Sequence, residues 1–295
     1  MRLLPHVEEL IPAPDPARCC EQLTGLAYRL FLDSSTARSN SGSKLGRYSF
    51  LMADPVAVVR SRGRSTTVHA PNDETVETVE TDALATVRRV LEPFRCAAVD
   101  GLPPFQGGAA GYLGYDWGLT LERLPAPRLD DLALDDVVIG LYDWVLAWDH
   151  LVGRAWLIST GMAIFSGQGA PRARARARQV KDWLATGGPH PPAGHERIDA
   201  PREMAPSHPV DGAGWDRTLD LRSSFTRAGY LDAVSRVREY IYAGDIFQAN
   251  LSQRFEVPFT DDPWAFYERL RARNPAPFGA FFDCPGAGLR ARRRS

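Results

Sequence analysis

Lysine is nearly absent from this sequence of 295 residues: it occurs only at Lys44 and Lys181, so arginine carries almost all of the positive charge. The part of the chain after Lys181 therefore has no lysine amine that could act as a nucleophile. An excess of one charge is lacking too, because 35 Lys and Arg residues oppose 36 Asp and Glu residues, for a net charge of −1. Without a net positive field, neither nucleic acid nor a membrane is expected as a partner.

Cysteine and long apolar runs are also scarce. The four cysteines are Cys19, Cys20, Cys96 and Cys284. The adjacent pair is too close for an ordinary disulfide, and no spacing matches a zinc site or a secreted disulfide framework. The first residues, MRLLPHVEELIPAPDP, contain acids and prolines where a signal peptide needs an unbroken apolar run, and no other stretch could span a membrane. We therefore expect a soluble protein of the reducing cytoplasm.

The usual motifs of nucleotide binding and nucleophilic catalysis are missing. GGAAGYLGYD has glycines at 107, 108, 111 and 114, but their spacing is not that of a dinucleotide-binding loop. Such glycines are more typical of close backbone approach in a sheet or of a tight turn. The sequence has no GxSxG or HExxH motif, and the acids at 130, 131, 135 and 136 are expected to face solvent.

Several local patterns in the first 185 residues predict secondary structure. Residues 82–94 predict a helix that begins after Asp82, and residues 55–70 predict a hairpin that turns at Arg60 to Gly63. Residues 137–148 predict a strand that turns at 150–153 into the apolar run AWLIST. The alternating arginines of residues 172–178 predict a helix with two rows of surface charge.

A second group of patterns follows a segment rich in proline and glycine. We assign residues 1–185 to a first region, 186–224 to a linker, and 225–295 to the start of a second domain. The second domain is predicted to contain a helix closed by Gly244, a strand at 247–257, a helix from Asp262 to Asn274, and a strand in FGAFFD.

Read in order, LFLDSS, LGRYSFLMADP, GGAAGYLGYD, GDIFQANLSQRF and NPAPFGAFF resemble the synthase subunits of the chorismate-utilising family. These are component I of anthranilate synthase and of aminodeoxychorismate synthase. The resemblance runs from about residue 10 to about residue 285. In GDIFQANLSQRF, Ala249 and Asn250 replace two valines common in anthranilate synthases, which favours the aminodeoxychorismate branch.

The resemblance implies an α+β fold of two curved antiparallel sheets packed as a sandwich, with helices outside. It implies a transferase that, with Mg²⁺, adds ammonia from a glutamine amidotransferase subunit to chorismate, on the route to p-aminobenzoate and folate. Magnesium suits this reaction because it binds carboxylate oxygens and polarises the leaving hydroxyl.

The sequence departs from this family after NPAPF. Neither a Ser-Pro-Glu-Arg-Phe segment nor a lysine-bearing Pro-Ile-Lys-Gly-Thr segment is present, and neither are the family's acidic magnesium ligands. The resemblance therefore implies no catalytic or metal-binding residue here, and we expect a fold that is incomplete at its C-terminus. The ending GLRARRRS, aberrant from about residue 286, predicts a truncated or frameshifted subunit.

The family's amino-acid pocket, which binds tryptophan in anthranilate synthases and some aminodeoxychorismate synthases, is implied by the motifs that remain. An amino-acid ligand needs oxygen acceptors for its ammonium group, donors for its carboxylate and an apolar slot. The matching positions are Ser34, Leu45, Gly46, Arg47, Tyr48, Pro277, Phe278 and Gly279.

Three functions are left open by the sequence. The first is aminodeoxychorismate synthase component I, represented here by an inactive fragment. The second is anthranilate synthase component I. The third is a non-catalytic remnant that binds an amino acid or a partner protein.

Overall fold

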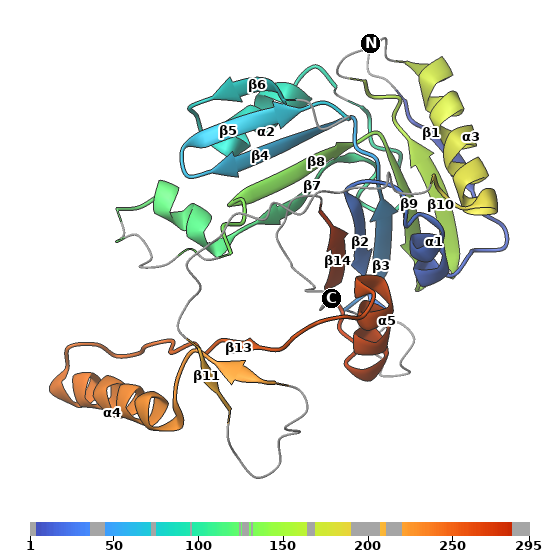
Figure 1. Ribbon diagram of the computed structural model, residues 1–295. Helices are drawn as coiled ribbons and strands as arrows, with labels where there is room; N and C mark the ends of the chain where they lie inside the picture. The colour runs from blue at the N-terminus through green and yellow to red at the C-terminus, as the bar shows by residue number, and fades with distance from the viewer. Residues whose placement is uncertain are drawn as a thin grey trace. The chain divides into compact units, whose positions relative to one another are not determined.

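The computed structural model describes residues 4–35, 45–71, 75–94, 96–123, 125, 130, 132–163, 169–189, 207–210 and 220–284 (Figure 1). The chain divides into a first unit, formed by residues 1–126, 134–196 and 262–287, and a second unit, formed by residues 127–133, 197–261 and 288–295. No helix among the described residues has the length and apolar character needed to cross a bilayer.

The first unit contains a six-stranded antiparallel sheet in the order β1-β10-β9-β3-β2-β14 (Figure 1). Its side chains alternate between two buried faces, as the period of two in a strand requires. On β9, Trp144, Leu146 and Trp148 face one core cluster, and Val145 and Ala147 face another. The strands are β1 (His6–Glu9), β2 (Arg29–Asp33), β3 (Tyr48–Met52), β9 (Trp144–Asp149), β10 (Arg154–Ser159) and β14 (Gly279–Asp283).

Three helices supply side chains to the outer core of this sheet: α1 (Pro16–Gln22), α3 (Ala170–Thr186) and α5 (Pro263–Arg273). The start of α5 is as predicted, because the Asp262 carboxylate accepts a hydrogen bond from the amide of Ala265 at 2.9 Å and Pro263 occupies the first turn. The core that these helices share with the sheet includes Cys20, Leu23, Phe31, Trp144, Ala177 and Trp264.

A five-stranded antiparallel sheet, in the order β6-β5-β4-β8-β7, packs against the inner face of the first sheet. Tyr142 and Ala110 of the smaller sheet share one cluster with Leu30 and Ile158 of the larger sheet. Helix α2 (Ala83–Leu91) packs on the other face of the smaller sheet. The predicted α+β sandwich of two antiparallel sheets with outer helices is thus confirmed. The strands are β4 (Ala57–Arg62), β5 (Ser65–His69), β6 (Thr75–Val79), β7 (Gly108–Leu113) and β8 (Val137–Tyr142), and a 3₁₀ helix, η2 (Tyr115–Thr120), follows β7.

The predicted hairpin that turns at 150–153 is confirmed, because β9 pairs with β10 in antiparallel fashion. The segment 137–148 before the turn is two strands and not one, because the chain changes sheets within it. Strand β8 ends at Tyr142 in the five-stranded sheet, and β9 begins at Trp144 in the six-stranded sheet. Asp143 lies at the crossing, and its carbonyl oxygen accepts a hydrogen bond from the amide of Thr160 at 2.8 Å. Every residue of β8 and of β9 is buried, so the apolar residues run on without a break that would indicate where the chain changes sheets.

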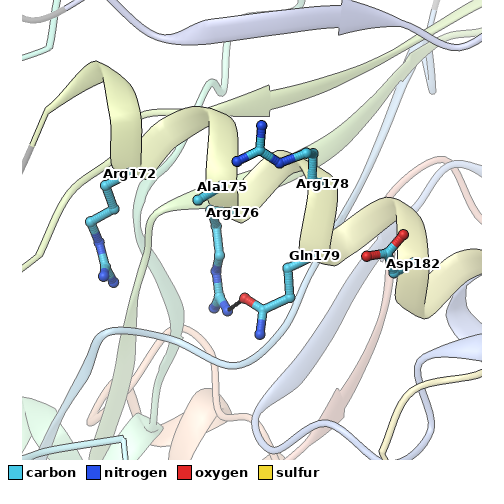
Figure 2. A pocket seen from close by; sticks show the side chains of 6 residues that line it. All are labelled: Arg172, Ala175, Arg176, Arg178, Gln179 and Asp182. Atoms are coloured by element: carbon cyan, nitrogen blue, oxygen red, sulfur yellow. Dashed lines mark hydrogen bonds between the residues drawn. The ribbon is translucent and has the colours of Figure 1, made fainter.

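The side chain of Asp143 is fully buried and is neutralised by arginines of α3. Its Oδ1 accepts a hydrogen bond from Arg176 Nε at 3.1 Å, and its Oδ2 lies 3.7 Å from an Arg172 nitrogen. Burial raises the pKa of Asp143, and the two guanidinium groups oppose that rise. Arg176 also binds the carboxylate of Asp54 at 2.8 Å and Gln179 at 2.8 Å (Figure 2).

The prediction that all arginines of α3 lie on the surface is therefore wrong for one of the two rows. Only 10% of the Arg176 side chain is exposed, and Figure 2 shows Arg172 and Arg176 leaving the same side of the helix. Arg174 and Arg178 are exposed, as predicted. A buried carboxylate on another element directs one row inward, and the sequence of the helix alone does not contain that information.

Gly111 confirms the prediction that these glycines serve a close backbone approach. A Cβ atom at this position would lie 2.0 Å from the carbonyl oxygen of Val138 on the paired strand β8. Gly114 is similar, since a Cβ there would lie 3.0 Å from the carbonyl oxygen of Asp136. The close approach of the chain to β8 and Asp136 therefore requires that residues 111 and 114 have no side chain.

Two other local predictions in the first unit hold. Asp82 caps α2 by accepting a hydrogen bond from the amide of Ala85 at 3.0 Å. The predicted hairpin is formed by β4 and β5, with its turn at Gly63, whose φ is 58°, and Arg64 rather than at Arg60 to Gly63. None of the four cysteines forms a disulfide, and burial raises the pKa of Cys19 and of Cys20 to about 12.

The second unit contains helix α4 (Arg227–Ala243) and three short paired strands, β11 (His208–Pro209), β12 (Arg222–Ser223) and β13 (Phe255–Glu256). Helix α4 ends as predicted at Gly244, whose φ is 80°. The predicted strand at 247–257 is wrong except for β13, and 91% of Phe247 is exposed. A strand needs a partner along its whole length, and β12 offers only two residues. The predicted linker at 186–224 lies mostly outside the described residues, and the tail from 286 lies wholly outside them.

Candidate pocket at the end of strand β2

The hydroxyl of Ser34 lies where three segments of the chain meet. Ser34 follows β2 directly and is 5% exposed. Its Oγ lies 2.5 Å from the carbonyl oxygen of Tyr48, at the start of β3, and 3.0 Å from the carbonyl oxygen of Pro277, just before β14. A hydroxyl group has one hydrogen, so it can donate to only one of these carbonyls at a time. The cluster therefore retains acceptor capacity for a further donor.

The residues on either side of Ser34 hold α5 and β14 in place. The Asp33 carboxylate is 3% exposed and accepts hydrogen bonds from Arg271 at 2.6 and 3.0 Å and from the Tyr267 hydroxyl at 3.1 Å. Burial raises the pKa of Tyr267, and the adjacent carboxylate raises it further. The Ser35 hydroxyl accepts a hydrogen bond from the amide of Ala276 at 2.9 Å. Three successive residues thus bind the segment that runs from α5 to β14: Asp33 binds α5, Ser35 binds Ala276 and Ser34 binds Pro277.

A second hydroxyl supports the backbone of Ser34. The Oγ of Ser49 accepts a hydrogen bond from the Ser34 amide at 3.0 Å and lies 2.7 Å from Nε2 of His150. The amide of His150 donates to the carbonyl oxygen of Arg47 at 2.9 Å. The turn after β9 is therefore joined to the start of β3, beside Ser34.

The guanidinium group of Arg47 pairs with Asp149. Arg47 donates to the two carboxylate oxygens of Asp149 at 2.6 to 3.1 Å and lies over the ring of Tyr48. This pairing lowers the pKa of the Asp149 carboxyl group. Because the charge of Arg47 is already paired, Arg47 is a weaker candidate donor for the carboxylate of a ligand than the sequence suggested.

The structure brings four of the eight residues predicted to bind an amino acid close to one another, and the other four do not join them through a hydrogen bond described here. The structure brings Ser34 together with Tyr48 and Pro277, and Gly279 pairs with Asp33 across β14 and β2. Gly46 is buried in the turn before β3, with φ 82°. Leu45 and Phe278 are 58% and 78% exposed, and Arg47 turns to Asp149.

Sequence reasoning missed several residues that hold the segments around Ser34 together. Asp33 and Ser35 flank Ser34, so their adjacency was an available signal. Tyr267 and Arg271 share one face of α5 by their spacing of four, but nothing in the sequence links that face to Asp33. Ser49 and His150 carried no signal, since the turn at His150 is brought to Ser49 only by the pairing of β9 with β3.

The arrangement suits a cationic donor better than an anion. The Ser34 hydroxyl lies within hydrogen-bond distance of two backbone carbonyl oxygens. All three oxygens can accept a hydrogen bond from an ammonium group. The described residues hold no group of three or more His, Cys, Asp or Glu side chains that could bind a metal ion. The described residues thus do not fit a magnesium site.

The fold of the chain is similar to that of a solved protein. The crystal structure of anthranilate synthase component I from Streptococcus pneumoniae TIGR4 superposes with a TM-score of 0.56, covering 82% of this chain and 50% of that one. The sequences are 24% identical, so this likeness defines the fold. The profile of the chorismate binding enzymes matches residues 29–289, and the chain belongs to that family.

Curated relatives come from both branches of the family. Aminodeoxychorismate synthase component 1 of Salmonella typhimurium is 35% identical over 237 residues, which is 80% of this chain and 44% of that protein. The Escherichia coli protein of the same name is 30% identical over 237 residues, with the same coverage. Anthranilate synthase component 1 of Cereibacter sphaeroides is 31% identical over 261 residues, or 86% and 49% of the two chains. The chain thus spans about half the length of the curated relatives it matches.

Proposed function

We propose that this chain is part of an aminodeoxychorismate synthase component I, a transferase that adds ammonia to chorismate to form 4-amino-4-deoxychorismate. The observation that carries this proposal is the 35% identity to the Salmonella typhimurium protein of that name, over 80% of this chain. In the complete cytoplasmic enzyme, a glutamine amidotransferase subunit would supply the ammonia and Mg²⁺ would assist loss of the hydroxyl. This chain would contribute the sandwich and the pocket at Ser34.

The reaction itself provides the first test. With chorismate, Mg²⁺ and ammonium, the 295-residue chain is expected to give no product above a buffer control, because it has no lysine after Lys181 and no Ser-Pro-Glu-Arg-Phe segment. The Salmonella typhimurium relative, assayed by the same chromatography, is the positive control. Turnover by the 295-residue chain would refute the view that its residues lack the catalytic groups.

We further propose that the pocket at Ser34 binds the ammonium group of an amino acid, with tryptophan as the first candidate. Support comes from the Ser34 hydroxyl and the carbonyl oxygens of Tyr48 and Pro277, which converge within 3.0 Å. Bound ammonium would add a charge-assisted hydrogen bond to acceptors that one hydroxyl hydrogen cannot satisfy together.

Replacing Ser34 by alanine is expected to weaken tryptophan binding about 10- to 100-fold, the usual effect of removing one hydrogen bond to a charged group. Isothermal titration calorimetry measures the change in Kd. Ser61→Ala is the matched control, because Ser61 is also a buried serine (3% exposed) but lies on β4, away from the pocket. Absence of heat with the wild-type chain, or equal losses in the two variants, would contradict the assignment.

Anthranilate synthase component I is the second candidate. The Cereibacter sphaeroides protein of that name is 31% identical to this chain over 261 residues, a longer match than that of the Salmonella typhimurium protein. A tryptophan Kd in the low micromolar range, with anthranilate as the product of the complete enzyme, would favour this branch. Tryptophan binding with no synthase activity in any complete form would favour a non-catalytic binding protein.

A further inference from the structure

A cavity lies in the first unit, between the end of helix α2 and the start of strand β7. Its volume is about 690 Å³, within the range of small-molecule sites. None of its ten lining residues, all in the described part of the chain, is charged. They are Leu91, Phe94, Cys96, Ala97, Ala98, Gly107, Gly108, Ala109, Thr160 and Met162.

One wall of the cavity is formed by small residues. Gly107, Gly108 and Ala109 present peptide groups and a single methyl group at the start of β7. Both glycines have positive φ, at 114° and 116°, which other residues rarely adopt. A Cβ atom on Gly107 would lie 2.9 Å from Thr160 Cγ2, whereas one on Gly108 would meet nothing within 4 Å. Gly108 thus leaves open space at this wall, and Gly107 avoids a clash with Thr160.

The other walls are apolar and contain sulfur. Leu91 and Phe94, at the end of α2, are half-buried and extend the core cluster to which Met162 belongs. Cys96 adds a thiol whose pKa is raised by burial, so it is uncharged at neutral pH. Thioethers and thiols make favourable contacts with aromatic rings. The shape and the chemistry together favour a planar aromatic molecule.

Thr160 is the one lining residue with a side-chain oxygen, and this oxygen can orient such a molecule. The Thr160 hydroxyl donates to the carbonyl oxygen of Asp143 at 3.2 Å and accepts from the amide of Met162 at 3.3 Å. Since its hydrogen is committed, the oxygen has one acceptor position left. The amide of Thr160 also donates to Asp143, at 2.8 Å, so this residue is fixed at the crossing between the sheets.

We propose that the cavity between α2 and β7 binds an uncharged planar aromatic molecule of one or two rings that carries an N–H or O–H donor. The donor binds Thr160, and the ring lies against the Gly107–Ala109 backbone, with Phe94, Cys96 and Met162 around it. This site is separate from the pocket at Ser34 and does not depend on the proposed synthase activity.

The test uses indole as the probe and alkylation of Cys96 by iodoacetamide as the readout, measured by peptide mass spectrometry. A small ring ligand is expected to bind with a Kd on the order of 1 mM. Several millimolar indole should therefore slow alkylation of Cys96 about fivefold. Cys284 does not line the cavity and serves as the internal control. 1-Methylindole lacks the donor and should need about two- to tenfold higher concentrations for the same protection.

A pair of variants locates the binding. Ala97→Asp places a carboxylate at the cavity wall and is expected to abolish protection by indole. Ala85→Asp, on the exposed side of α2, leaves it unchanged. The ratio of rates with and without indole is compared within each variant, which removes any effect on the intrinsic reactivity of Cys96. Unchanged Cys96 alkylation at the solubility limit of indole overturns the proposal. The proposal is also overturned if indole protects Cys284 as well as it protects Cys96, or if it protects Cys96 equally in the Ala97→Asp variant. Equal protection of Cys96 by 1-methylindole and by indole would overturn it too.

Discussion

Replacing Arg176 by leucine is expected to lower the free energy of unfolding by about 3–5 kcal/mol, because it leaves the buried carboxylate of Asp143 without its main counter-ion. Arg176 donates to Asp143 at 3.1 Å and to Asp54 at 2.8 Å, and only 10% of its side chain is exposed. Arg172 stands 3.7 Å from the other Asp143 oxygen and compensates only in part. Thermal unfolding should show the loss as a fall in Tm of about 6–20 °C.

The defect should depend on pH in a defined direction. Burial already raises the pKa of Asp143, and loss of Arg176 raises it further. Between the unfolded and the folded pKa, the folded variant binds more protons than the unfolded chain, so its stability decreases as pH rises. The difference in Tm between wild type and variant should therefore be smaller at pH 5 than at pH 7.

Arg178→Leu provides the control for both measurements. Arg178 lies on the same helix, half a turn further along, and is exposed. Its replacement should change the free energy of unfolding by less than about 0.5 kcal/mol at either pH. If the two variants lose equal stability, or if the Arg176 defect grows toward pH 5, the buried ion pair does not have the role described.

Replacing Gly111 by alanine is expected to destabilise the first unit by about 3 kcal/mol or more, although one methyl group is a small addition. The new Cβ would lie 2.0 Å from the carbonyl oxygen of Val138 and 2.9 Å from Cα of Ile139. Both atoms belong to the backbone of β8, which cannot turn aside as a side chain can. Relief requires β7 to move away from β8, with loss of hydrogen bonds between them.

Gly118→Ala is the matched control for this variant. Gly118 lies a few residues downstream, in η2, and a Cβ atom there would meet nothing within 4 Å. Its replacement is expected to be neutral or slightly stabilising, because alanine restricts the unfolded chain. Denaturant unfolding of both variants measures the difference. A Gly111→Ala protein as stable as wild type would show that β7 and β8 do not require this close contact.

Local structure was the part of the fold that the sequence predicted well. Asp82 and Asp262 begin helices and Gly244 ends one, because each acts on backbone groups within a few residues. The predicted strand at 247–257 failed for the opposite reason. Its alternating pattern is real, but a strand forms only against a partner, and the two residues of β12 pair only with Phe255 and Glu256 of this segment.

The residues proposed to bind an amino acid came from motif resemblance. The structure brings Ser34, Tyr48 and Pro277 together, although Ser34 and Pro277 lie 243 positions apart in the sequence. The motifs also pointed to Leu45 and Phe278, which are exposed, and they did not point to Ser49 and His150, which lie beside Ser34. A motif marks a stretch of chain, whereas the side chains that converge are chosen by strand pairing and by the register of β14 on β2.

By itself the sequence determined the family resemblance, the fold that this resemblance implies and the chemistry for which this chain lacks residues, since these depend on motif order and composition. Only the tertiary structure decided that the chain changes sheets at Asp143, that Arg176 turns inward while Arg178 faces solvent, and that a cavity opens beside Gly108. The physical reason is the distance along the chain over which each interaction acts. Helix caps and side-chain alternation act over a few residues, whereas the burial of a charge or the wall of a cavity is set by segments brought together from distant parts of the chain.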